Sequence, residues 1–144
     1  MESNAKRILA LDVGAKVIGV AVSDPLMCTA QGIGSIRRGP STAHDIDKII
    51  TLARQYEIGE VVVGLPLNMN GTLGPQGQRV KAFGRQLEEK LGIAVHYWDE
   101  RLTTVAATRT LLEGDVSRQK RKKLVDRLAA TYILQSYLDY RRNL

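Results

Sequence analysis

The sequence predicts an α/β fold in which helices flank a mixed, five-stranded sheet. The first 36 residues carry short apolar runs separated by turn residues, and the remainder alternates helical patterns with short apolar runs. Strands that follow one another directly pair antiparallel, whereas strands separated by helices pair parallel. The predicted order is β-β-β-α-β-α-β-α-α, so three antiparallel strands precede two parallel ones.

Three strands are expected before the first helix. Residues 8–11 and 17–23 are apolar runs joined by the tight turn at residues 12–16, and this pattern predicts a hairpin. A third strand is expected within residues 30–36, although two glycines weaken the pattern there.

Helices and strands then alternate. The sequence Pro40-Ser41-Thr42 offers capping residues for a helix through about Tyr56, and the β-branched run 61–63 predicts a strand buried on both faces. The remaining expected elements are a loop at 64–77, a helix to about 91, a strand at 93–98, a helix from Thr103 or Thr104 to about 113, and a last helix at about 122–141.

Length and composition indicate one globular domain spanning residues 1–144. The hydrophobic content of 44% suits an ordinary core. Cys28 is the only cysteine, so neither an intramolecular disulfide nor a zinc-ligand spacing exists. The N-terminal residues lack the apolar stretch of a secretory signal, and no segment has the roughly 20 apolar residues of a membrane span. We therefore expect a cytoplasmic protein that does not act at a membrane.

The positive charge is concentrated near the C-terminus. Residues 1–100 carry 11 Lys/Arg and 11 Asp/Glu, whereas residues 101–144 carry 10 Lys/Arg and 4 Asp/Glu. The densest part is the run 118–123, directly before the residues of the last helix that carry Asp126, with a basic loop expected to lead into that helix at about residue 122. Such a run suits a nucleic-acid backbone, where each neutralised phosphate releases counterions. A solvated loop that only aids solubility is the alternative.

Three carboxylates lie where a lone acid is hard to explain. Asp12 and Glu100 each follow an apolar run, and Asp126 lies on the apolar stripe of the last predicted helix. Because a buried carboxylate is costly unless paired or bound to a metal, the three acids predict a shared divalent cation site. Taken alone, Asp12 is also explained as a turn cap, and Glu100 as a surface ion pair with Arg101 or another neighbour. Asp126 alone is also explained as the buried partner of Arg101 or Arg127.

Three clustered acids suit phosphodiester hydrolysis, which needs an activated water and neutralised phosphoryl oxygens. Two Mg²⁺ or Mn²⁺ ions roughly 3.5–4 Å apart supply both functions. Acids from two strand ends and one helix, brought to one metal centre, are the layout of a nuclease of the ribonuclease H type. The predicted order of strands and helices along the chain is ribonuclease H-like as well.

Four co-linear segments resemble the YqgF family, also called RuvX. They are LDVGAKVIGVAVSD at residues 11–24, VGLPLNMNG at 63–71, DERLTT at 99–104 and DRLAATYILQ at 126–135. The resemblance covers nearly the whole chain. One departure is that Val17 follows Lys16 where the family usually has Lys-Arg, which removes a possible phosphate contact and leaves every carboxylate in place.

The resemblance implies a fold like that of the RuvC Holliday-junction resolvases. It implies a metal-dependent nuclease that matures the 5′ end of precursor 16S ribosomal RNA, with Asp12, Glu100 and Asp126 as the catalytic, metal-binding set. In the expected arrangement Asp12 bridges two Mg²⁺ or Mn²⁺ ions, and Glu100 and Asp126 each anchor one. The expected partners are precursor rRNA, a pre-ribosomal particle, or alternatively branched DNA. Both a monomer and a homodimer are compatible with these partners, and symmetric cutting of a junction would require the dimer.

Ten further residues are candidates for substrate binding. Ligands often bind at the loops that leave strand ends, and cationic side chains suit phosphates. Each candidate is equally explained as an ordinary exposed polar residue. The candidates are Lys16, Asn68, Asn70, Thr72, Arg101, Arg118, Lys120, Arg121, Lys122 and Lys123.

Three other functions compete with precursor rRNA cleavage. An ATP-using enzyme of the actin and sugar-kinase type also has an apolar-Asp-x-Gly hairpin, but it needs two such lobes and 144 residues supply one. A non-catalytic nucleic-acid-binding module would be favoured by loss of one acid, and all three acids are present. A resolvase-like DNA endonuclease keeps the chemistry and changes the substrate.

Overall fold

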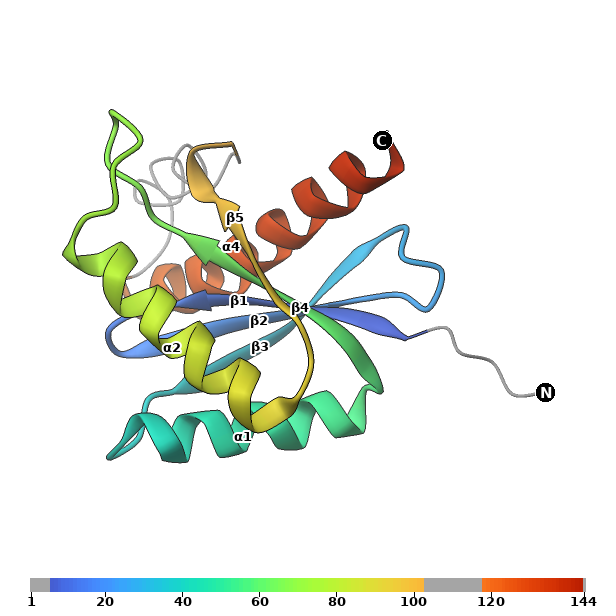
Figure 1. Cartoon of the computed structure of the whole chain (residues 1–144), viewed down its shortest axis with the longest axis horizontal. Helices are drawn as coiled ribbons and strands as arrows, with labels where there is room; N and C mark the ends of the chain where they lie inside the picture. The colour runs from blue at the N-terminus through green and yellow to red at the C-terminus, as the bar shows by residue number, and fades with distance from the viewer. Residues whose placement is uncertain (1–5, 103–117, 144) are drawn as a thin grey trace.

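The computed structural model describes residues 6–102 and 118–143, and within residues 118–127 it describes the backbone alone. The strands and helices follow one another along the chain in the order that Figure 1 shows. They are β1 (Arg7–Val13), β2 (Val17–Ser23), β3 (Ala30–Arg37), α1 (Thr42–Gln55), β4 (Ile58–Leu65), α2 (Pro75–Leu91), β5 (Val95–Asp99), the 3₁₀ helix η1 (Glu100–Leu102) and α4 (Arg118–Arg142).

The five strands form one mixed sheet in the order β3-β2-β1-β4-β5. β1 pairs antiparallel with β2, and β2 pairs antiparallel with β3. β4 pairs parallel with β1 on one side and with β5 on the other. The predicted α/β fold with a mixed five-stranded sheet is confirmed. The parallel pairs arise because α1 and α2 each return the chain across the sheet before the next strand begins.

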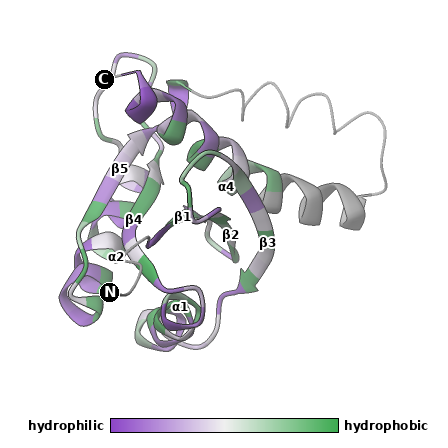
Figure 2. Ribbon diagram, turned by 90° about the vertical axis from the view of Figure 1, so that its right-hand side faces the viewer, coloured by the Kyte–Doolittle hydropathy of each residue, from purple (hydrophilic) through white to green (hydrophobic). Residues whose placement is uncertain are grey.

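The helices form a layer on each face of the sheet, with α1 and α2 on one side and α4 on the other (Figure 2). The alternation of side chains along β1 divides the core accordingly. Leu9 and Leu11 belong to the cluster built with α1 and α2, whereas Ile8 and Ala10 belong to the cluster built with α4. Both faces of β1 are therefore buried, which explains its unbroken apolar run.

The predicted hairpin between β1 and β2 is confirmed, with Gly14 at its turn. The Gly14 N–H donates to the Val17 carbonyl at 2.9 Å. A Cβ atom at position 14 would lie 2.7 Å from the same carbonyl oxygen. Since real Cβ contacts are longer than this, only glycine allows the turn to close so tightly.

Several element boundaries differ from the sequence prediction. β1 continues through Val13, so Asp12 lies inside the strand. β4 covers Ile58–Leu65, far beyond the predicted 61–63, because strand pairing on both sides extends it. α4 begins at Arg118, so the first part of the basic run, predicted as a loop before residue 122, is helical, in keeping with the good helix propensity of Lys, Arg and Gln. The helix predicted from Thr103 or Thr104 lies outside the described residues.

Among the described residues, no helix combines the length and the apolar character needed to cross a membrane.

Candidate functional site

The C-terminal ends of β1, β4 and β5 meet at one edge of the sheet, here called the site edge. The loop 66–74 that follows β4 and the η1 turn that follows β5 both lie there (Figure 1). The C-terminal edge of parallel strands is where ligands of α/β proteins commonly bind. Two of the three predicted carboxylates, Asp12 and Glu100, are carried by elements that end at this edge.

Asp12 lies on the α4 face of the sheet near the C-terminus of β1. Ile8 and Ala10 pack in the α4 cluster, and the alternation of a strand places Asp12 on the same face. Its exposed fraction is 9%. Removing a carboxylate from solvent costs free energy, which hydrogen bonds from polar partners or a bound cation must offset.

Glu100 is the first residue of η1, directly after β5, and its side chain lies against Gly64 near the C-terminal end of β4. A Cβ atom placed at Gly64 would be 2.8 Å from the Glu100 Oε1 atom. Leu11 of β1 pairs with Val63 of β4, so Asp12 and Gly64 are the next residues on neighbouring strands. The Glu100 carboxylate therefore lies over the strand adjacent to Asp12.

Asp126 belongs to α4, and its side chain lies outside the described residues. Along the helix it precedes Ala130 by four residues and Ile133 by seven, and both of these are fully buried against the sheet. Helical periodicity places positions 126, 130 and 133 on the same side of α4. Among the described side chains, no group of three or more acids, histidines and cysteines is arranged to hold a metal ion.

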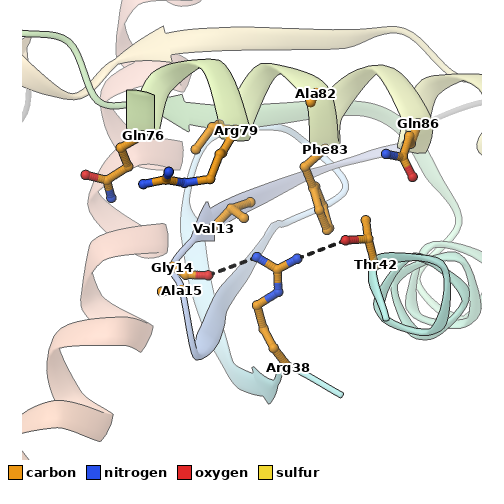
Figure 3. Close-up of a pocket in the computed structure, with 11 residues that line it drawn as sticks. Val13, Gly14, Ala15, Arg38, Thr42, Gln76, Arg79, Ala82, Phe83 and Gln86 are labelled. Atoms are coloured by element: carbon orange, nitrogen blue, oxygen red, sulfur yellow. Dashed lines mark hydrogen bonds between the residues drawn. The ribbon is translucent and has the colours of Figure 1, made fainter. Parts of the chain in front are cut away.

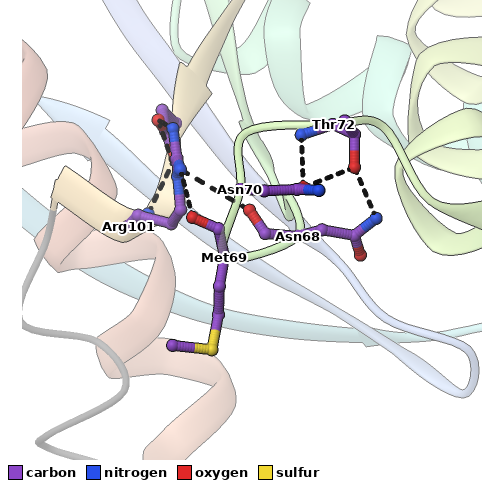
Figure 4. A network of polar contacts seen from close by, with 6 residues as sticks. Asn68, Met69, Asn70, Thr72 and Arg101 are labelled. Carbon is purple, nitrogen blue, oxygen red and sulfur yellow. Dashed lines mark hydrogen bonds and ion pairs between the residues drawn. The ribbon is translucent and has the colours of Figure 1, made fainter.

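Arg101 joins the end of β5 to the loop after β4 (Figure 4). Its Nε and Nη2 atoms donate to the Asp99 carboxylate at 2.7–3.1 Å. Its Nη1 atom donates to the Met69 carbonyl at 3.1 Å, with the Asn68 carbonyl at 3.5 Å. We call this arrangement the Asp99–Arg101 clamp. The side-chain hydrogen bond from Arg101 lowers the pKa of Asp99 below its ordinary range, against the opposing effect of burial.

The three polar candidates in the loop after β4 bond to one another (Figure 4). The Asn68 Nδ2 atom donates to Thr72 Oγ1 at 2.9 Å, and Thr72 Oγ1 lies 2.6 Å from Asn70 Oδ1. The backbone closes the same turn, because the Asn68 N–H donates to the Thr72 carbonyl at 2.9 Å. All three residues are exposed, so the loop has a defined shape and retains accessible polar atoms.

The cationic candidates differ in how far the structure describes them. Lys16 is exposed at the β1–β2 turn, next to the strand that carries Asp12, and its carbonyl accepts from the Arg38 N–H at 2.8 Å. Arg101 belongs to the Asp99–Arg101 clamp, and the remaining cationic candidates lie in the first turns of α4, with side chains outside the described residues; they are Arg118, Lys120, Arg121, Lys122 and Lys123.

A hollow of about 640 Å³ lies on the opposite face of the sheet, between the β1–β2 turn, α1 and α2 (Figure 3). Arg38 and Arg79 line it together with the amides of Gln76 and Gln86, and none of the described residues that line it is acidic. The Arg79 side chain forms no hydrogen bond or ion pair with any residue that the structure describes. A smaller hollow of about 350 Å³ at the first turn of α2 shares Gln76 and Arg79 with it.

Arg38 was not identified from the sequence, and it fixes the turn beside Asp12. Its Nη1 atom donates to the Gly14 carbonyl at 3.2 Å, and its Nε atom donates to Asp45 Oδ2 at 3.0 Å. Asp45 is 1% exposed and also accepts from the Gly39 N–H at 2.8 Å. Burial alone would raise the pKa of Asp45, but the hydrogen bonds from Gly39 and Arg38 prevail and lower it. No sequence pattern identifies this pair, because Arg38 precedes α1 whereas Asp45 lies within it.

Comparison with known proteins agrees with this fold. The model of the RuvX family, described as Holliday junction resolvase, matches residues 6–140. A protein of Clostridium botulinum is 59% identical over 133 residues, which are 92% of this chain and 96% of the relative. A protein of Moorella thermoacetica is 58% identical over 133 residues, which cover 92% and 94% of the two chains. Both relatives are named "Putative pre-16S rRNA nuclease".

Two solved structures share the fold at low sequence identity. Thermus thermophilus RuvC in complex with Holliday junction substrate superposes with a TM-score of 0.60 at 12% identity, covering 96% of each chain. The yeast mitochondrial Holliday junction resolvase Ydc2 gives a TM-score of 0.51 at 10% identity, covering 96% of this chain and 82% of that one. These likenesses show that the fold is ribonuclease H-like. Because the RuvX family model matches residues 6–140, nearly the whole of this chain, the chain belongs to the RuvX family.

Proposed function

We propose that this chain, a nuclease by its family, uses divalent metal ions at the site edge to hydrolyse phosphodiester bonds of precursor 16S ribosomal RNA. The observation that carries the proposal is the position of the Glu100 carboxylate, which lies over Gly64 on the strand adjacent to Asp12. The names of the relatives at 56–59% identity support the choice of RNA substrate.

The residues at the site edge suit a hard divalent cation. Mg²⁺ and Mn²⁺ prefer carboxylate oxygens, and both described acids offer them. Asp12 is nearly buried, and a Gly64 Cβ would fill the space in which the Glu100 carboxylate lies. Asp12, Glu100 and Asp126 would hold the ions. When bound, the ions activate the attacking water and neutralise charge on the phosphoryl oxygens.

The reaction forms a bond between a water oxygen and phosphorus and breaks the bond from phosphorus to the 3′ oxygen. The products are a 5′-phosphate and a 3′-hydroxyl, and the proton lost by the water balances the one gained by the leaving oxygen. Lys16 at the β1–β2 turn, the loop 66–74 and the basic first turns of α4 would bind the substrate backbone on either side.

The experiment is a cleavage assay titrated with Mg²⁺ and Mn²⁺, using a precursor 16S rRNA 5′-end fragment. Wild type is compared with Asp12→Asn, Glu100→Gln and Asp126→Asn, and exposed Asp47 on α1 supplies the matched control Asp47→Asn. We expect metal-dependent cleavage by wild type and Asp47→Asn, and a loss of at least about 100-fold in the three site variants. Near-normal cleavage by any site variant would remove that acid from the mechanism.

Branched DNA is a second candidate substrate, because the family model is described as Holliday junction resolvase. A four-way DNA junction is therefore included in the same assay. Preferential cleavage of the junction by a protein that is dimeric in solution would favour a resolvase-like DNA endonuclease, since a resolvase must cut two strands symmetrically. Binding without cutting by wild type would favour a non-catalytic module. With precursor rRNA as the substrate, we propose that the protein acts in the cytoplasm on RNA presented by a pre-ribosomal particle.

A further inference from the structure

We infer that Gly64 is a positioning residue, whose missing side chain lets Glu100 reach across β4 toward Asp12. The inference rests on the proposed metal-dependent function of the site edge. The inference assigns a role to a residue that has no side chain.

The sheet order creates the need for such a residue. β4 lies between β1, which carries Asp12, and β5, which leads into Glu100. Neighbouring strands are about 4.8 Å apart, so the two acids start about 10 Å apart in the plane of the sheet. A carboxylate from the end of β5 can approach Asp12 only by passing over β4.

Gly64 occupies the point on β4 where Glu100 passes. It pairs with Trp98 of β5 and follows Val63, the partner of Leu11 in β1. On the α4 face, positions 12, 64 and 98 thus form a row across three strands.

The space beside Gly64 is filled from two directions. A Cβ atom there would lie 2.8 Å from Glu100 Oε1, 3.3 Å from Glu100 Cγ and 2.4 Å from Ile133 Cδ1. Distances below 3.0 Å are essentially never found for real Cβ atoms, so something would have to move. The two nearest atoms lie at the far ends of flexible side chains, and Ile133 of α4 is fully buried against the sheet. A methyl group at position 64 would therefore push the Glu100 carboxylate out of its place.

A glycine inside a buried central strand requires a local reason, because it leaves the strand without a side chain to pack. The φ angle of Gly64 is not among the positive values found in the described residues. Backbone conformation thus does not explain the glycine, and the space taken by Glu100 and Ile133 does.

The Asp99–Arg101 clamp holds Glu100 from the other side. The Arg101 N–H donates to Asp99 Oδ1 at 2.9 Å, which closes the turn that contains Glu100. The Arg101 side chain then fixes that turn to the loop after β4. Gly64 provides the space, and the clamp sets the direction from which Glu100 enters it.

The test measures Mn²⁺ binding by calorimetry, without substrate, for wild type, Glu100→Gln and Gly64→Ala. We expect Gly64→Ala to weaken Mn²⁺ binding by at least about tenfold, the usual range for residues that orient a metal ligand. Glu100→Gln should weaken binding by at least as much. Gly84→Ala is the matched control: its Cβ would lie 2.3 Å from the Tyr97 hydroxyl oxygen, on the other face of the sheet. It should reduce thermal stability and leave Mn²⁺ affinity unchanged.

A second variant separates positioning from packing. In Gly64→Ala/Ile133→Val the overlapping δ-methyl of Ile133 is removed, so thermal stability should recover in part while Mn²⁺ binding stays weak. Recovery of Mn²⁺ affinity in this double variant, or wild-type affinity in folded Gly64→Ala, would overturn the inference alone. Wild-type Mn²⁺ binding that is insensitive to Glu100→Gln would overturn the proposed metal site and the inference together.

Discussion

A substitution at Arg101 tests whether this residue positions the site edge or binds the substrate directly. The sequence suggests that its guanidinium contacts substrate, whereas the structure shows four of its hydrogen bonds to Asp99 and two to loop carbonyls. Substituting Arg101→Gln removes the charge and most of these bonds. We expect this change to act mainly on the position of Glu100, the preceding residue.

The expected magnitudes follow from exposure and geometry. The side chains of Arg101 and Asp99 are 42% and 20% exposed, so their ion pair contributes about 1 kcal/mol or less to the free energy of unfolding. The melting temperature should therefore fall by only about 2–4 °C. A displacement of about 1 Å at a catalytic group can cost about 100-fold in rate, so kcat should fall by roughly 10- to 100-fold.

The assay compares cleavage of the precursor rRNA fragment by wild type, Arg101→Gln, Asp99→Asn and the double variant at several salt concentrations. If the clamp positions Glu100, both single variants lower kcat, the double variant is little worse than either, and the salt dependence of KM is unchanged. If Arg101 instead binds a phosphate, Arg101→Gln raises KM and reduces the salt slope by about 1, and Asp99→Asn does not. The second result would refute the positioning argument.

Two other substitutions test features away from the acids. If the hollow beside α2 binds the substrate backbone, Arg79→Gln should raise the KM for RNA a few-fold and reduce the salt dependence of KM. The control is Arg85→Gln, on the same helix but outside the hollow. Equal effects of the two substitutions would indicate general charge attraction instead. Asp45→Asn should lower the free energy of unfolding at pH 7 by about 3 kcal/mol, because it breaks a nearly buried pair with Arg38. Since the pKa of Asp45 is lowered in the fold, its contribution is complete above the ordinary carboxyl pKa and is lost as pH falls through the folded value. Urea unfolding of wild type and Asp45→Asn should therefore converge in acid, and a difference that persists at low pH would contradict the assignment.

Much of the architecture could be predicted from sequence because its signals are local. The apolar runs of β1 and β2, the glycine at their turn, and the apolar stripe of α4 depend on periods of two and 3.6 residues, which the sequence shows directly. Element boundaries were less predictable. β4 is longer than its β-branched centre because β1 and β5 pair with it on both sides, and the basic run 118–123 joins α4 because its residues favour helix.

The sequence by itself determined the order of strands and helices along the chain, the family and the candidate acids, since each rests on local patterns and short motifs. Only the tertiary structure decided that Glu100 passes over Gly64, and that Arg101 is bonded to Asp99 and to a loop about 30 residues away. The pairing of Arg38 with Asp45 beneath the β1–β2 turn was likewise decided there. The physical reason is that these contacts depend on the neighbours of each strand in the sheet, such as β4 between β1 and β5, and on the space beside Gly64. Local sequence patterns predict neither of these.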